Sequence, residues 1–516
     1  MKSKQLFGGR SGSIALCLIA VYSILICFSV IMSETFIHDD NMYIAAGILL
    51  SEKQIYSDFS YLQTPYMPYL YNLVFSLNDY SHPLLVGKLL KFILSTIEVI
   101  LLYLLFRFLS GNKWISASFI LIVVNNRIFR SIIPYIRNYD LALILALSAF
   151  LFYFYRRGRS TGRQWLTYLI TGMLTGAAIG VKLTFGLVPL CFLIPLFIEY
   201  RSSTKGWQLF ASFISGMVLF LLPAIIITVR PGFDIGYFNN IGYHSLNVAW
   251  VMTEVSESSV YFHEKLLYFL NIFTCVRSNI FLLILFIYAI LVSAKEKISV
   301  KYSNSPYPVV LLFLFVGVLM FFLPTPSGEG YLYAAIPAFL MLICILYRKF
   351  SDTEKKRISI LSWAVAVVLI LGNGALDLKM INTAFIPSAW GPNKMHESIQ
   401  TLADYIPEDQ RNQPVATLHS AIPLEVGMDI YPEFSSGEFT CRIAHILSGT
   451  ELDRYGISAP RFISSLLEEN PPSAIIVKVD IARWEVPFME YAETHGYEDF
   501  YTLDEYIFYI KTVGAE

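Results

Sequence analysis

Residues 14–43 read IALCLIAVYSILICFSVIMSETFIHDDNMY, an apolar run that ends shortly before two adjacent carboxylates, Asp39 and Asp40. A helix needs about 20 apolar residues to cross the hydrocarbon core of a bilayer, so this stretch predicts a membrane span. Similar runs begin near Leu84, Trp114, Leu141, Trp165, Leu183, Trp207, Leu266, Pro308, Tyr331 and Ile358. We therefore expect a mostly α, polytopic transmembrane helical bundle of about eleven spans.

The composition agrees with this fold class. The chain has 516 residues, of which 55% are hydrophobic and 15% charged, and its mean hydropathy is +0.56. Soluble domains have about a quarter of their residues charged, so a soluble enzyme, a disordered chain and a coiled coil are excluded. The six cysteines are widely spaced and contain no CxxC pair, which excludes a disulfide scaffold and a zinc ribbon.

The charges divide the chain into two parts. From Ile381 onward 8 Lys and Arg residues stand against 21 Asp and Glu, a net charge of −13, whereas the preceding part has 30 against 18, a net charge of +12. We therefore predict a membrane domain over residues 1–379, with a long first outer loop at 34–83, and a soluble domain over residues 380–516.

Cationic residues in short loops favour the cytoplasmic side. With the N-terminus inside, the expected inner loops hold about 19 Lys and Arg residues, and the outer loops of the membrane domain hold about 7. This places the C-terminal domain outside, in the periplasm of a Gram-negative cell. The expected location is thus the bacterial inner membrane, with the first span retained as an anchor.

The C-terminal domain has the pattern of a small α/β fold. Strands are expected at 415–418, 474–477 and 506–510, and helices at 393–405, 459–469 and 484–495, which predicts a partly parallel sheet. We see no catalytic constellation in this sequence. His396 and His419 are interpreted as ordinary polar residues rather than metal ligands.

Several polar residues stand where the membrane makes them costly. Asp39 and Asp40 can be functional carboxylates, or they can cap a helix that begins in the loop. The stretch containing Tyr61, Gln63 and Pro65 forms either a substrate loop or an amphipathic interfacial turn.

Three further candidates lie at the same face. Asp140 opens an apolar segment, so a helix-capping role competes with a chemical one. Lys182 stands between two apolar runs, where it can snorkel to the interface or bind a lipid phosphate. Tyr331 belongs to a Tyr-rich turn that an aromatic belt would also explain.

The order of these features resembles the GT-C glycosyltransferases, in the branch of bacterial aminoarabinose transferases, protein mannosyltransferases and lipopolysaccharide glycosyltransferases. The resemblance covers roughly the first 350 residues and is strongest over residues 34–190. It implies an inverting enzyme that moves a sugar from a polyprenyl phosphate to an acceptor hydroxyl on a glycan, a lipid or a protein. No nucleic acid partner is expected.

The resemblance implies a role for each residue that matches a motif of the family. Asp39 is similar to the acidic residue that activates the acceptor, Asp40 to its acidic neighbour and Asp140 to the second-loop aspartate. Lys182 and Tyr331 are similar to residues near the donor phosphate. Where aminoarabinose transferases read Glu-Lys-Pro-Pro, this chain reads Gln-Thr-Pro-Tyr at residues 63–66. A metal-holding glutamate and a phosphate-binding lysine are therefore missing.

This departure leaves two questions open. Arg137 and Arg277 are the candidates to supply the missing cation at the donor phosphate. No cofactor is assigned, and a divalent metal stays an open alternative. Two other functions compete with the glycosyltransferase: a transporter or flippase for a lipid-linked saccharide, which predicts broken helices and polar residues at mid-membrane, and a membrane anchor for an acidic binding domain.

Overall fold

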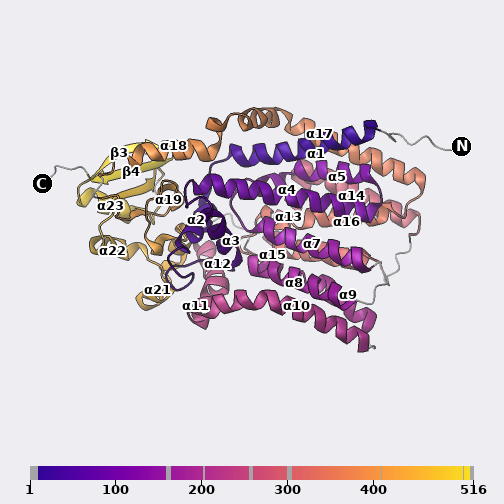
Figure 1. Ribbon diagram of the computed structural model, residues 1–516, viewed down its shortest axis with the longest axis horizontal. Coiled ribbons are helices and arrows are strands. Elements are labelled where there is room, and N and C mark those ends of the chain that lie inside the picture. Colours follow the sequence, from indigo (N-terminus) through magenta and orange to yellow (C-terminus); the bar gives the residue numbers. More distant parts are fainter. Residues whose placement is uncertain are drawn as a thin grey trace.

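The computed structural model describes residues 10–157, 164–201, 204–254, 260–298, 305–407, 410–480, 482–503 and 505–511. Within these ranges the chain forms a bundle of long helices with a small α/β domain at one end (Figure 1). The expected inner-loop cations Lys2, Lys4, Arg159, Arg163 and Lys301 lie outside the described residues.

Seven helical segments are long and apolar enough to cross a membrane. They contain α1 (Arg10–Ser33), α4 (Pro83–Ser110), α7 (Tyr139–Arg157), α10 (Thr204–Val229), α14 (Arg277–Lys295), α16 (Ala335–Tyr347) and α17 (Asp352–Ala384). The α16 segment continues a short turn, η3 (Glu329–Leu332). The other bundle helices are α5 (Lys113–Val124), α8 (Gln164–Val181), α9 (Leu190–Tyr200), α13 (Phe262–Cys275) and α15 (Tyr307–Phe322). The chain is an integral membrane protein with the predicted bundle architecture.

The outside of the bundle is apolar, as lipid contact requires. Leu18 on α1, Ile100 on α4 and Leu219 on α10 are each more than half exposed. Between α8 and α10 the backbones approach closely, because Gly172 and Gly216 carry no Cβ. A Cβ on either residue would lie 2.0 Å from a carbonyl oxygen of the opposite helix. Small residues at such contacts are the usual way in which membrane helices pack.

One expected span is divided in two. The apolar run that begins near Leu266 was predicted as a single segment, but the helix breaks at Val276, where α13 ends and α14 begins. The buried side chain of Asn279 donates to the carbonyl oxygen of Ile272 at 3.1 Å and accepts from Asn126 at 2.8 Å. A break inside a bundle is tolerated where side chains satisfy the freed backbone groups.

Short elements fill the junction between the bundle and the C-terminal domain (Figure 1). They are α2 (His38–Leu49), α3 (Tyr66–Ser76), α6 (Arg127–Ile132), η1 (Leu183–Leu187), α11 (Phe233–Tyr237), η2 (Phe238–Gly242) and α12 (Tyr243–Glu254). Most of these elements belong to two long connections, residues 34–82 between α1 and α4 and the described residues 230–254 and 260–261 between α10 and α13, whereas α6 and η1 lie in shorter connections.

The C-terminal domain holds a four-stranded sheet in the order β1-β2-β4-β3. The strands are β1 (Val415–Thr417), β2 (Ala474–Lys478), β3 (Tyr497–Leu503) and β4 (Tyr506–Lys511). β1 pairs parallel with β2, whereas β4 pairs antiparallel with β2 and β3, so the prediction of a partly parallel sheet is confirmed. β3 was not expected, because it is a bulged edge strand that begins with the polar run Tyr497-Glu498-Asp499.

The helices of this domain are α18 (Gly391–Ala403), α19 (Ala421–Leu424), α20 (Glu438–Ala444), α21 (Gly449–Tyr455), α22 (Ile463–Glu469) and α23 (Val486–Thr494). Single 3₁₀ turns lie at η4 (Pro387–Ala389), η5 (Pro432–Phe434) and η6 (Pro460–Phe462). The predicted helices correspond to α18, α22 and α23. The boundary expected at residue 379 falls near the end of α17, which continues to Ala384.

Candidate active site

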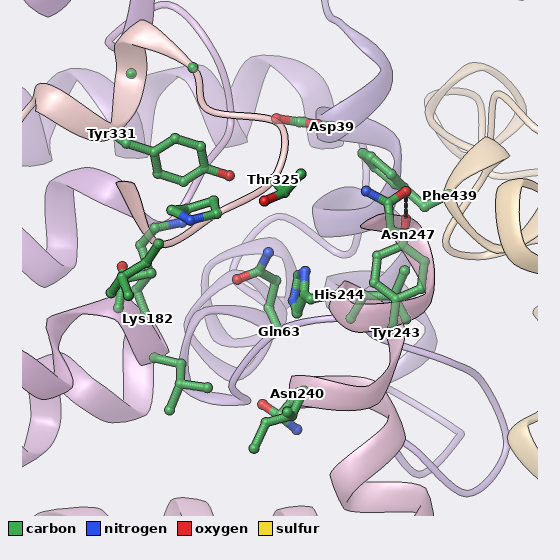
Figure 2. Close-up of a pocket in the computed structure, with 18 of the residues that line it drawn as sticks. Asp39, Gln63, Lys182, Asn240, Tyr243, His244, Asn247, Thr325, Tyr331 and Phe439 are labelled. Carbon is green, nitrogen blue, oxygen red and sulfur yellow. Dashed lines mark hydrogen bonds between the residues drawn. The ribbon is translucent and has the colours of Figure 1, made fainter. Parts of the chain in front are cut away.

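A cavity of about 870 Å³ lies in the junction layer, between the bundle and the C-terminal domain. Five predicted residues line it, and they come from four separate segments: Asp39, Gln63, Arg137, Lys182 and Tyr331. Figure 2 shows Lys182 and Tyr331 on one side of the cavity, with Tyr243, Asn247 and Phe439 on the opposite side. The sequence order that suggested a site is thus matched by proximity in space.

Asp39 lies in the first turn of α2, where the helix dipole favours a carboxylate. Its Oδ2 atom pairs with Nη2 of Arg137 at 2.6 Å, and its Oδ1 atom with Nε2 of His38 at 3.1 Å. Burial alone would raise the pKa of Asp39, but Arg137, His38 and Lys182 together hold it well below its usual range. Asp39 is therefore an ionised carboxylate with low proton affinity in the free protein.

Lys182 follows α8 in an extended conformation, which turns its side chain out of the helical path and into the cavity. Its Nζ atom donates to Oδ1 of Asn138 at 3.1 Å and lies 3.8 Å from the ring centroid of Tyr139 and 6.0 Å from that of Tyr331. Burial, aided by the charge of Arg137, lowers the pKa of Lys182 to about 7. The ammonium is thus held in place by an amide and two aromatic rings.

Asn138 connects two of the predicted residues, Lys182 and Gln63, although it was not itself predicted. It is fully buried, donates to the carbonyl oxygen of Val181 at 3.0 Å and lies 3.4 Å from Oε1 of Gln63. Asn138 therefore fixes Lys182 relative to the loop that contains Gln63. An amide between an arginine and a tyrosine in a loop carries no signal that sequence reasoning could have used.

The C-terminal domain contributes Phe439 and Arg442, both on α20, to the lining. Arg442 pairs with Glu438 at 2.9 Å, and its guanidinium carbon lies 4.7 Å from the ring centroid of Phe439 and 5.0 Å from that of Trp250. The described lining thus contains three Lys and Arg side chains, Arg137, Lys182 and Arg442, against the single carboxylate of Asp39. This excess suits an anionic ligand.

The other candidates do not line the cavity. Asp140 is fully buried beneath it, where it pairs with Lys91 and lies 3.4 Å from the hydroxyl of Tyr333. That hydroxyl donates to Glu98 at 2.7 Å, so a charged cluster extends into the bundle. Arg277 is exposed at the start of α14, close to Gly372 of α17.

Asp40 is also fully buried, next to Asp39. Its Oδ2 atom accepts from the backbone N–H of Ile37 at 3.1 Å, and burial raises its pKa to about 6. Tyr61 and Pro65 are buried and do not line the cavity, and the backbone N–H of Tyr61 donates to Oδ1 of Asn239 at 3.1 Å. Asp40, Tyr61 and Pro65 can thus support the cavity wall from behind.

The lining offers few metal ligands. Among the residues that the structure describes, a single group of three His, Cys, Asp or Glu side chains has ligand atoms close enough to hold a metal, and none of its members lines the cavity. Because the carboxylate of Asp39 already faces Arg137 and His38, the residues present do not fit a metal at this position.

Comparison with known proteins identifies the type of fold. A family model described as dolichyl-phosphate-mannose-protein mannosyltransferase matches residues 62–227. ArnT from Cupriavidus metallidurans, solved with bound undecaprenyl phosphate, superposes with a TM-score of 0.64 at 10% identity, over 98% of this chain and 99% of that one. The apo oligosaccharyltransferase from Archaeoglobus fulgidus gives a TM-score of 0.50 at 11% identity, over 97% of this chain and 75% of that one. No curated protein sequence matches the chain.

These similarities confirm the resemblance to the GT-C superfamily and show that the chain has a GT-C fold resembling that of ArnT. The family match includes the loop with Gln63, the turn with Arg137 and the residue Lys182, and it ends within α10. Gln63, Arg137 and Lys182 therefore lie in the part of the chain that the family model covers, whereas Asp39, Tyr331 and α20 lie outside it.

Proposed function

We propose that this chain is a glycosyltransferase that moves a sugar from a polyprenyl phosphate to an acceptor hydroxyl within the junction cavity. The observation that carries the proposal is a cavity with three cationic side chains and one carboxylate, at one end of a GT-C bundle. The undecaprenyl phosphate bound to ArnT supports a polyprenyl donor of the same chemical kind. The donor sugar and the acceptor are left open.

The donor phosphate is assigned to the side of the cavity formed by Lys182, Tyr331 and Arg137. As the bond between the anomeric carbon and the phosphate oxygen breaks, its electron pair stays with the phosphate, which gains a negative charge. The ammonium of Lys182 and the guanidinium of Arg137 stabilise that charge, and the surrounding rings keep water away from it.

Asp39 is assigned as the base. The acceptor oxygen attacks the anomeric carbon from the face opposite the phosphate and gives its proton to the carboxylate of Asp39. One displacement of this kind inverts the configuration at the anomeric carbon. The reaction then leaves a glycosylated acceptor, a polyprenyl phosphate and a protonated Asp39 that releases its proton to water.

The pairing of Asp39 with Arg137 links donor binding to base strength. In the free protein Arg137 keeps the pKa of Asp39 low, which makes the carboxylate a weak base. A donor phosphate competes for the same guanidinium, and its own negative charge also opposes ionisation of Asp39. Donor binding therefore raises the proton affinity of Asp39, so that the base becomes effective only when the sugar is in place.

The active face is proposed to be the outer one. α1 begins at the end of the bundle opposite the C-terminal domain (Figure 1). Arg107 and Lys113, which flank the connection between α4 and α5, and the cations between α16 and α17 belong to the expected inner loops. The cationic bias of these loops supports a cytoplasmic position for that end and a periplasmic position for the cavity.

The test uses purified protein in nanodiscs, a panel of undecaprenyl-phosphate sugars and envelope extract from a deletion strain as the acceptor. Release of undecaprenyl phosphate and mass spectrometry of the acceptor report transfer. Asp39→Asn keeps the shape but removes the base, so turnover should fall by about a hundredfold or more. Asp79→Asn, in the same first outer loop but exposed, should have no effect. Equal turnover in Asp39→Asn and the wild type would refute the assignment of the base.

A transporter of lipid-linked saccharides is the second candidate. The observation that favours it is the buried cluster of Lys91, Glu98 and Asp140, since charges inside a bundle often mark a transport path. A transporter would move the intact lipid-linked sugar across vesicle membranes and release no undecaprenyl phosphate. A simple anchor for the C-terminal domain would do neither, and it leaves the cationic cavity without a role.

A further inference from the structure

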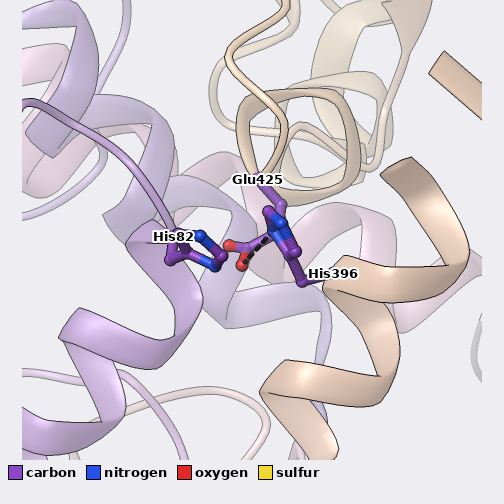
Figure 3. Close-up of side chains that lie close together, drawn as sticks. All are labelled: His82, His396 and Glu425. Carbon is purple, nitrogen blue, oxygen red and sulfur yellow. Dashed lines mark ion pairs between the residues drawn. The ribbon is translucent and has the colours of Figure 1, made fainter. Parts of the chain in front are cut away.

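A second cluster of polar side chains joins the membrane domain to the C-terminal domain, away from the junction cavity. His82 precedes α4, His396 lies on α18, and Glu425 follows α19. Each offers one ligand atom, and these atoms all lie within 4.8 Å of one another. Figure 3 shows the carboxylate of Glu425 next to His82 and His396, whose imidazole rings stack on each other with their centroids 3.7 Å apart.

Glu425 is the member of the cluster that points to a ligand. Its side chain is fully buried, and its Oε2 atom accepts from the backbone N–H of Leu84 at 2.8 Å. The Oε1 atom forms an ion pair with Nδ1 of His396 at 3.3 Å when that imidazole is protonated, but neither atom has a hydrogen-bond partner of proper direction. A buried carboxylate oxygen that faces two imidazoles without a hydrogen bond is an uncommon and costly arrangement unless a further charge satisfies it.

We propose that His82, His396 and Glu425 bind one Zn²⁺ ion that fastens the C-terminal domain to the membrane domain. From the sequence alone His396 is interpreted as an ordinary polar residue, and neither His82 nor Glu425 is near it in the chain. The fold brings together two segments that are more than 300 residues apart, and only then does a ligand set appear.

The ligand chemistry selects zinc. Two imidazole nitrogens and one carboxylate oxygen form a set that Zn²⁺ accepts with a water molecule in the fourth position, whereas Mg²⁺ and Ca²⁺ prefer oxygen ligands alone. At Zn–N and Zn–O distances of about 2.0–2.2 Å, tetrahedral ligand atoms are about 3.3 Å apart. Because the two rings stack, at least one imidazole must turn about its Cβ–Cγ bond to bring both nitrogen lone pairs to one ion. His396 retains 18% exposure, which gives the ion and its water access to solvent.

The surroundings already orient one ligand. The backbone N–H of Leu84 holds the Oε2 atom of Glu425, which leaves Oε1 to face the imidazoles. Such a hydrogen bond to a ligating carboxylate commonly sets its orientation and contributes to metal affinity. The same bond attaches Glu425 to the first turn of α4, so an ion bound here would couple the position of α4 to that of α18 and α19.

A bound ion would affect the cavity only indirectly, through the position of the C-terminal domain. α20 of the C-terminal domain supplies Phe439 and Arg442 to the cavity lining, and its position depends on how this domain is docked. A Zn²⁺ ion at the cluster would lower the freedom of the docked domain without touching substrate. It is therefore a separate property from the chemistry assigned to Asp39 and Lys182.

The experiment measures metal binding alone, with no donor or acceptor. Full-length protein without an affinity tag is treated with a chelator, reloaded with Zn²⁺, passed through size exclusion and analysed for zinc per chain by mass spectrometry. The wild type should retain one Zn²⁺ per chain and unfold at a higher temperature than the chelated protein. His82→Asn and His396→Gln should lower the Zn²⁺ affinity at least about tenfold and abolish the shift in unfolding temperature.

The choice of variants separates metal loss from misfolding. His82 has a φ of +47°, and asparagine tolerates this left-handed conformation better than other polar residues. His419→Gln is the matched control, because His419 also pairs with a buried glutamate, Glu485, at 2.9 Å but belongs to no group of three ligands among the described residues. This control should bind zinc as the wild type does.

A readout on the unaltered protein keeps the proposal testable if the variants do not fold. Co²⁺ loaded into the chelated wild type should give the visible absorption of a tetrahedral nitrogen and oxygen site. The proposal is overturned if the wild type binds neither Zn²⁺ nor Co²⁺ after reloading. It is equally overturned if the His82 and His396 variants bind zinc as tightly as the wild type.

Discussion

Replacement of Lys182 by methionine tests the donor side of the cavity most directly. Methionine keeps the unbranched stem that packs beside Tyr139 and removes the ammonium that lies 3.8 Å from the centroid of this ring. In the free protein the ammonium donates one hydrogen bond, to Asn138, and it has further donors for a phosphate. The variant should therefore fold and insert normally but bind the donor more weakly.

The magnitude follows from the kind of contact that is lost. A hydrogen bond to a charged group contributes about 1.5–3 kcal/mol, which corresponds to an increase of about 10- to 150-fold in Kd. Lys182→Arg restores the charge in a larger, planar group, so it should recover part of the affinity.

The pH dependence makes the prediction sharper. Burial lowers the pKa of Lys182 to about 7 in the free protein, so the ammonium is present below this pH and is lost as the pH rises through it. A bound phosphate favours the protonated form and raises the pKa in the complex. Donor affinity of the wild type should therefore fall by up to about tenfold per pH unit above pH 7. Lys182→Arg stays protonated and should bind independently of pH in this range, and Lys182→Met should bind weakly throughout.

The assay is equilibrium binding of an undecaprenyl phosphodiester to protein in nanodiscs, because a phosphodiester keeps a single negative charge over the whole range. Binding that is equally tight in Lys182→Met and the wild type would refute the role of the ammonium at the phosphate. Lys182 would then serve only to hold Asn138 and Tyr139 in place. A wild-type profile as flat as that of Lys182→Arg would instead refute the lowered pKa of Lys182.

Three further predictions test other parts of the structure. A periplasm-active reporter should be active when fused after Lys394 and inactive when fused after Arg156, and the reverse pattern would overturn the proposed orientation. Asp140→Asn should lower the free energy of unfolding, measured by thermal denaturation, by about 3 kcal/mol, because it leaves the buried ammonium of Lys91 without its partner. The double variant with Lys91→Met and Asp140→Leu should recover most of this loss. Arg442→Gln should raise the acceptor KM by about tenfold and leave the donor Kd unchanged. A raised donor Kd would contradict the assignment of the donor phosphate to the side of the cavity formed by Lys182 and Arg137.

The bundle could be predicted from the sequence because its cause is local. An apolar run of sufficient length becomes a helix wherever a bilayer surrounds it, and the runs near Ile14, Leu84 and Ile358 correspond to α1, α4 and α17. The break at Val276 could not be predicted in the same way. It depends on a hydrogen bond between Asn279 and the distant Asn126, which only the folded bundle brings together.

The same distinction applies to the site. Asp39 and Lys182 could be identified because a charge next to an apolar run is conspicuous in the sequence itself, and both line the cavity. Asp140 has the same local signal, yet its partner Lys91 lies 49 residues earlier on α4 and turns it into a buried ion pair. Arg442 has no such signal, because its place at the cavity depends entirely on the docking of the C-terminal domain.

This docking suggests how the cavity distinguishes its two substrates. The membrane domain carries an excess of positive charge and the C-terminal domain an excess of negative charge, and the cavity lies between them. Under the proposed function, we expect Lys182 and Arg137 to attract the donor phosphate on the membrane side. On the other side Arg442 is already paired with Glu438 and covered by Phe439, so it offers less charge to a second phosphate. The donor is therefore expected to bind against the bundle, and the acceptor hydroxyl to approach between α12 and α20, where aromatic and amide side chains replace free cations.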